Sequence, residues 1–187
     1  MGSASRFTPM LASMVRSGLI IDVPVAEPAV GDWRRRLDPQ TALGIPPHVT
    51  VLFPFVSPDE IDDATIAAVD AVLAPIPRFD FQLTRTAWFG DEEVLWLAPE
   101  PAGPFQRITT VLAEAFPDYP PYGGQFDGLV PHLTIGTQGT GAQLREAAAE
   151  IQQQLPIPAT ADAVTLMTEL PGGRWERRHT FILAGDG

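Results

Sequence analysis

The feature that most constrains the fold of this chain is a five-residue stretch that occurs twice. Residues 47–51 (PHVTV) match residues 131–135 (PHLTI), and the two copies hold two of the three histidines of the chain. Aliphatic residues that alternate with histidine and threonine are typical of a strand, in which residues i and i+2 face the same side. We therefore expect His48 with Thr50, and His132 with Thr134, to share one face of their strands, while the aliphatic residues are buried on the other.

The elements around the two copies repeat in the same order, which predicts an internal duplication. A strand, a helix, the motif strand, a capped helix and another strand are expected in residues 19–88 and again in residues 94–170. Ser57 with Glu60, and Thr140 with Gln143, have the spacing of capping boxes that begin a helix. Such a duplication predicts two sheets about a pseudo-twofold axis, with a cleft between them.

The length and composition of the chain limit its organisation and its location. We interpret the 187 residues as one domain, residues 1–187, with lobes at 19–90 and 91–187 and a flexible arm at 1–17. The sequence contains no apolar run of membrane-spanning length. It also contains no cysteine, which excludes disulfides, a thiolate nucleophile and a cysteine-ligated metal. A cytoplasmic monomer is the default expectation.

The charge of the chain limits its partners. The formal net charge is −11, and all twelve cations are arginine because lysine is absent. An acidic surface repels polyanions, and binding to long nucleic acid requires a basic footprint. We therefore expect a small nucleotide or an RNA terminus as substrate, and neither long nucleic acid nor a membrane as partner. The run of three arginines at residues 34–36 is interpreted as a solvated helix end.

Two histidines and two threonines that face one site favour acid–base chemistry on a phosphate. A neutral imidazole accepts a proton near neutral pH and a charged one donates it, while hydroxyls donate hydrogen bonds to an anionic oxygen. Phosphodiester transfer or hydrolysis without a cofactor is the reaction class that this set predicts. Two alternatives stay open: structural histidines on strands, and a three-histidine zinc site that would include His179. No His-x-His or His-Glu-x-x-His pattern supports the metal site.

The paired motif resembles that of the 2H phosphoesterase superfamily, in its bacterial 2′-5′ RNA ligase-like branch. The resemblance covers most of the chain, from about residue 19 to 183, and includes residues 88–90 (WFG), 94–97 (VLWL) and 170–175 (LPGGRW). It implies a bilobal α+β fold, with two pseudo-symmetric antiparallel-sheet lobes, outer helices and a central cleft. It also implies metal-independent hydrolysis of a cyclic phosphodiester, typically a 2′,3′-cyclic nucleotide or RNA end, to a 2′-phosphate.

The motif positions of that family carry over to His48, Thr50, His132 and Thr134, which we predict to be catalytic. The resemblance leaves open a 2′-5′ RNA ligase or 2′-5′ oligonucleotide phosphodiesterase. A non-catalytic module that binds a phosphate or nucleotide is a further alternative. The sequence does not assign the acid and the base between the two histidines.

Four further residues are candidates for substrate binding. Tyr122 and Phe126 lie in a segment rich in proline and glycine just before the second motif, where an aromatic ring could stack on a base. Arg177 and His179 belong to the densest basic cluster and are expected to share one face of a strand, with Arg178 on the other. A contact with the phosphate is predicted for this cluster, and a solvated hairpin is the alternative.

Overall fold

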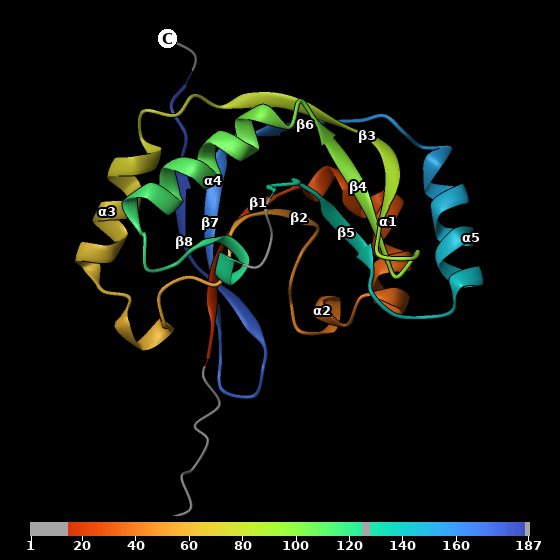
Figure 1. Ribbon diagram of the computed structural model, residues 1–187, viewed down its shortest axis with the longest axis horizontal. Helices are drawn as coiled ribbons and strands as arrows, with labels where there is room; N and C mark the ends of the chain where they lie inside the picture. The colour runs from red at the N-terminus through yellow and green to blue at the C-terminus, as the bar shows by residue number, and fades with distance from the viewer. Residues whose placement is uncertain (1–14, 125–127, 186–187) are drawn as a thin grey trace, which may run out of the picture.

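The structure, a computed structural model, describes residues 15–124 and 128–185 and contains two four-stranded antiparallel sheets. The strand order is β2-β1-β7-β8 in the first sheet and β5-β4-β3-β6 in the second (Figure 1). The strands are β1 (Ser17–Asp22), β2 (His48–Leu52), β3 (Phe79–Phe89), β4 (Val94–Glu100), β5 (Leu133–Gly136), β6 (Ile157–Ala161), β7 (Ala163–Glu169) and β8 (Trp175–Ile182).

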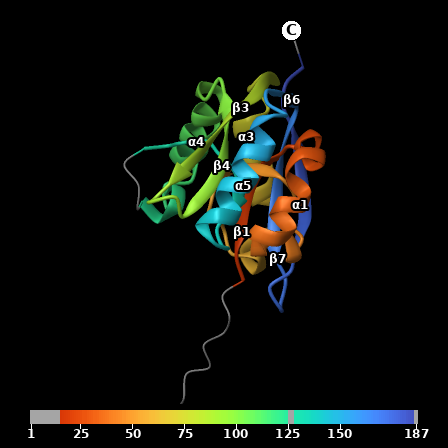
Figure 2. The ribbon, with the colours of Figure 1, turned by 90° about the vertical axis from the view of Figure 1, so that its right-hand side faces the viewer.

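Helices cover one face of each sheet. One helix of each half, α1 or α4, packs on the sheet that holds the motif strand of the other half. α3 and α4 pack on β8 and β2 of the first sheet, whereas α1 and α5 pack on β5 and β3 of the second (Figures 1 and 2). The helix that follows β1 thus covers the second motif strand, and the helix that follows β4 covers the first. The helices are η1 (Pro24–Ala26), α1 (Glu27–Leu37), α2 (Pro39–Ala42), η2 (Pro58–Glu60), α3 (Asp63–Leu73), α4 (Gly103–Ala115), η3 (Pro121–Gly124) and α5 (Gly141–Gln152), where η denotes a 3₁₀ helix.

The bilobal α+β architecture and the repeated element order are confirmed. β1-α1-β2-α3-β3 is followed by β4-α4-β5-α5-β6. The predicted lobes, 19–90 and 91–187, divide the chain in sequence order. The two sheets do not divide it at that limit, because β3 pairs with β4 and β7 pairs with β1. Only Asp162 separates β6 of the second sheet from β7 of the first. The chain therefore passes directly from the second sheet back into the first, where β7 and β8 lie.

Two predicted boundaries are wrong. Ser17 does not belong to a flexible arm, because it is buried at the start of β1 and its hydroxyl donates to the Val56 carbonyl; residues 1–14 lie outside the described part of the chain. Ser57 precedes the short 3₁₀ helix η2, but its side chain makes no capping hydrogen bond, and α3 begins only at Asp63. The Asp62 carboxylate caps α3 instead, because it accepts hydrogen bonds from both the backbone N–H and the hydroxyl of Thr65.

The second predicted cap is confirmed. The Thr140 hydroxyl accepts from the Gln143 N–H, and the Gln143 side chain accepts from the Thr140 N–H in return, so α5 begins with a complete capping box. Within residues 15–124 and 128–185, no helix is long and apolar enough to cross a membrane.

Candidate active site

The two motif strands lie side by side, each at the edge of its own sheet. β2 ends the first sheet, β5 ends the second, and the two are in contact (Figure 1). Val49 and Leu133 are fully buried under the helices, whereas Thr50 and Thr134 are only half-buried on the opposite faces. The alternation predicted from the sequence therefore holds in both copies, and it turns both histidine–threonine pairs away from the helices.

Both motif histidines make the same local hydrogen bond. Nδ1 of His48 lies 2.8 Å from the Pro46 carbonyl, and Nδ1 of His132 lies 2.8 Å from the Val130 carbonyl. A carbonyl oxygen only accepts, so Nδ1 must carry the proton in each ring. The tautomer is thereby set, and Nε2 is the atom with which each imidazole can exchange a proton.

His48 lies among charged groups that the sequence motif does not include. Its cross-strand partner on β1 is Asp22, and Arg34 and Asp38 approach from the end of α1. The pKa of His48 is lowered from 6.5 to about 4, mainly by burial and in part by the Arg34 guanidinium, while the bond to Pro46 and the two carboxylates oppose the shift. At neutral pH this imidazole is uncharged and its Nε2 can accept a proton.

The solvated-helix-end interpretation of residues 34–36 is wrong for Arg34. Its guanidinium is buried, 2.8 Å from the Asp38 carboxylate, and also donates to the Ile45 carbonyl; only Arg35 and Arg36 are exposed. Helical periodicity could have identified this residue, because position 34 lies four residues after Val30 and three before Leu37, both in the core.

His132 is surrounded by aromatic rings. Its ring centroid lies 5.0 Å from that of Phe89 and 5.9 Å from that of Trp96, both in edge contact, and 6.4 Å from that of Tyr122, which stacks on it. Burial lowers the pKa of His132, and the bond to Val130 opposes this. Trp96 is buried and also contacts the second histidine.

Tyr122 lies between the two motifs. Its ring stacks on His132, and its backbone N–H donates to the Phe53 carbonyl at 2.6 Å, directly after the first motif strand. Burial raises the pKa of the phenol above its ordinary value of 10. Phe126, the other predicted stacking residue, lies outside the described residues.

The structure separates Arg177 from His179, contrary to the prediction that they share a face. A bulge in β8 pairs Arg177 with Met167 but His179 with Leu166, and this shift of register turns the two side chains to opposite faces. Arg177 donates to the Asp22 carboxylate at 2.9 Å, on the face that carries His48. His179 instead contacts the ring of Phe181, which belongs to the core under the helices.

The three histidines do not converge on one point. His179 is on β8, three strands from β2 in the first sheet, a lateral separation of about 14 Å at the usual strand spacing. In the part of the chain that the structure describes, no three His, Asp or Glu side chains are grouped so that they could hold a metal ion. The arrangement therefore does not support the three-histidine zinc alternative.

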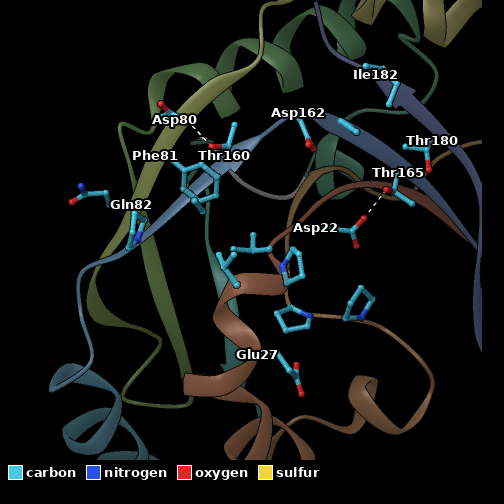
Figure 3. Close-up of a pocket in the computed structure, with 18 of the residues that line it drawn as sticks. Asp22, Glu27, Asp80, Phe81, Gln82, Thr160, Asp162, Thr165, Thr180 and Ile182 are labelled. Atoms are coloured by element: carbon cyan, nitrogen blue, oxygen red, sulfur yellow. Dashed lines mark hydrogen bonds between the residues drawn. The ribbon is translucent and has the colours of Figure 1, made fainter. Parts of the chain in front are cut away.

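A hollow of about 1350 Å³ lies beside the motif face of the first sheet (Figure 3). Asp22 and Pro46, which flank His48, line it, but neither motif histidine does. Its walls carry one arginine, Arg177, against five carboxylates: Asp22, Glu27, Asp80, Glu100 and Asp162. This charge balance disfavours a phosphate, so the hollow is distinct from the site that an anionic group would occupy between the histidines.

Sequence comparison identifies relatives along nearly the whole chain. Residues 22–173 match the family model of the 2′-5′ RNA ligase superfamily. A protein of Geobacillus kaustophilus named "Putative phosphoesterase" is 26% identical over 179 residues, which cover 91% of this chain and 98% of the relative. A protein of Geobacillus thermodenitrificans with the same name is 24% identical over 160 residues, which cover 82% of this chain and 87% of the relative.

Solved structures share the fold. TT0787 of Thermus thermophilus superimposes with a TM-score of 0.60 at 16% identity, over 92% of this chain and 100% of that one. LigT of E. coli, in complex with 3′-AMP, superimposes with a TM-score of 0.56 at 17% identity, over 92% of this chain and 99% of LigT. The family model spans most of the residues that build both sheets and both motifs, so this chain belongs to the 2′-5′ RNA ligase superfamily, the 2H phosphoesterases.

Proposed function

We propose that this chain is a metal-independent phosphodiesterase that opens a 2′,3′-cyclic phosphodiester, on a small nucleotide or an RNA end, to a 2′-phosphate. The observation that carries the proposal is the matched pair of 2.8 Å bonds from Nδ1 to a carbonyl, which leave Nε2 of His48 and of His132 for proton transfer on adjacent edge strands. A pair of identical tautomers suits acid–base catalysis, in which one ring accepts a proton and the other donates one.

We infer the two roles from the surroundings of the histidines. His48, with a pKa of about 4 and a nearby guanidinium, is neutral across the physiological range and acts as the base. His132, buried among aromatic rings rather than beside a cation, acts as the acid, because a bound phosphate anion stabilises its imidazolium form.

The proposed step moves two protons. His48 Nε2 takes a proton from water while the water oxygen attacks phosphorus, and the bond from phosphorus to the 3′ oxygen breaks. His132 Nε2 gives its proton to that oxygen, which leaves a 2′-phosphate and a free 3′-hydroxyl. The hydroxyls of Thr50 and Thr134 donate to the phosphoryl oxygens as negative charge builds on them.

Two further observations favour a small nucleotide as substrate. LigT, which shares the fold, has been crystallised with 3′-AMP, with NADP⁺ and with phosphate. The net charge of −11 opposes long-range attraction of long nucleic acid, whereas a cyclic mononucleotide carries a single negative charge.

The test is turnover of the four 2′,3′-cyclic nucleoside monophosphates in EDTA between pH 4 and 9, with the products separated by chromatography. We expect a 2′-monophosphate and a bell-shaped kcat/KM with its maximum between pH 4 and 6.5, because the base must be deprotonated and the acid protonated in the free enzyme. Formation of a 3′-monophosphate, or loss of activity on chelation, would contradict the proposal.

Matched variants identify the two groups. His48→Asn and His132→Asn keep a donor where Nδ1 stands but lack Nε2, and each should lower kcat by about 10²- to 10⁴-fold with an unchanged fold. His179→Asn, on the opposite face of β8, is the control and should retain wild-type turnover. Nucleotide binding without turnover in the wild type would favour a binding module instead.

A further inference from the structure

We infer that Tyr122 is a positioning residue that couples the two halves of the active site, because its backbone is bound to the strand of the first motif and its ring is stacked on His132 of the second. The inference rests on the proposed function and goes beyond it, because it assigns a role to a side chain outside both motifs. Tyr122 reaches both at once: its N–H donates to the Phe53 carbonyl directly after β2, and its ring is stacked on the imidazole that precedes β5.

The ring of Tyr122 fixes the plane of His132. Of the three rings around this imidazole, Phe89 and Trp96 meet it at 85° and 67°, whereas Tyr122 lies at 24° to it. The edge contacts and the hydrogen bond to Val130 hold the ring from its side, and the stacked phenol covers a face. Together they limit rotation of the imidazole and its access to water, which aims Nε2 and contributes to the lowered pKa.

The backbone of Tyr122 is anchored to the first motif strand. Its N–H donates to the Phe53 carbonyl, directly after β2, and its φ of +52° is one that side-chain-bearing residues rarely adopt. Gly123 and Gly124 continue the left-handed turn with φ of 64° and 73°. The residue is thus fixed to the strand of Thr50 by its backbone, and reaches the other motif with its ring.

Two substitutions test the contact of the ring with His132. Tyr122→Leu removes the ring at similar volume, whereas Tyr122→Phe keeps the ring and removes only the hydroxyl. The chain has one other tyrosine, Tyr119, which packs against Phe55 at 5.6 Å between ring centroids, away from both motifs. Tyr119→Phe is therefore the matched control, and thermal melting checks that all three variants fold.

Titration of the histidine ring protons by NMR, without substrate, tests the contact with the ring. We expect the His132 pKa to rise toward 6.5 in Tyr122→Leu and to stay at the wild-type value in Tyr122→Phe and Tyr119→Phe. An unchanged His132 titration in folded Tyr122→Leu would overturn the inference. This readout does not depend on activity, so it remains decisive even if the proposed reaction fails.

Discussion

Acid should destabilise this protein in part by protonating His48. The folded chain holds this imidazole at a pKa of about 4, against 6.5 for an ordinary histidine, mainly because the ring is buried. Between these two values the unfolded state binds more protons than the folded state. Stability therefore falls as the pH drops from 6.5 toward 4. Above about pH 7 the imidazole is neutral in both states, and no stability is lost through it.

The size of the effect follows from the shift. The two pKa values differ by about 2.5 units, and each unit corresponds to 1.36 kcal/mol, so His48 alone should cost about 3 kcal/mol of unfolding free energy between pH 7 and pH 4. A typical domain is stable by about 5–15 kcal/mol, so a loss of this size is measurable.

The assay is urea unfolding from pH 4 to 8 of the wild type, of His48→Asn and of His179→Asn. His48→Asn keeps a donor for the Pro46 carbonyl but does not titrate, so its stability should fall by about 3 kcal/mol less than that of the wild type over this range. His179, exposed on β8, is the control, and its variant should follow the wild type. Parallel loss of stability in wild type and His48→Asn would refute the reasoning.

Three further substitutions test packing and capping by urea unfolding at pH 7. Arg34→Met should cost about 3–5 kcal/mol, because it leaves the buried Asp38 carboxylate without its cation. Thr140→Ala should cost about 1 kcal/mol, since the capping box of α5 is lost. Gly136→Ala should cost about 1–3 kcal/mol, because the added methyl carbon would lie 2.8 Å from Cβ of Leu37 on α1.

Each of these has a control in the same chain. Arg35→Met, next to Arg34 but exposed, should cause no measurable change. Thr140→Ser keeps the capping oxygen and should be close to the wild type. Gly103→Ala, at the start of α4, adds a methyl group with no neighbour within 4 Å and should be neutral. A control that loses as much stability as its partner would show that the named contact is not the cause.

Helix caps illustrate where local sequence suffices and where it does not. The Thr140 capping box was predicted correctly because its two partners lie three residues apart and act within one turn. At the other cap the predicted residue, Ser57, makes no capping hydrogen bond with its side chain. Asp62, rather than Ser57, begins the helix because its charged carboxylate accepts two hydrogen bonds from Thr65.

The sequence by itself determined the repeated motif strands, the order of elements and the face on which His48, Thr50, His132 and Thr134 lie, because strand alternation depends only on local geometry. Only the tertiary structure decided what surrounds them. The burial of Arg34, the rings around His132 and the place of Tyr122 between the motifs all depend on contacts between residues far apart in the chain. So do the exchange of helices between the sheets and the bulge that separates Arg177 from His179, since these follow from how strands pair and not from the residues of any one strand.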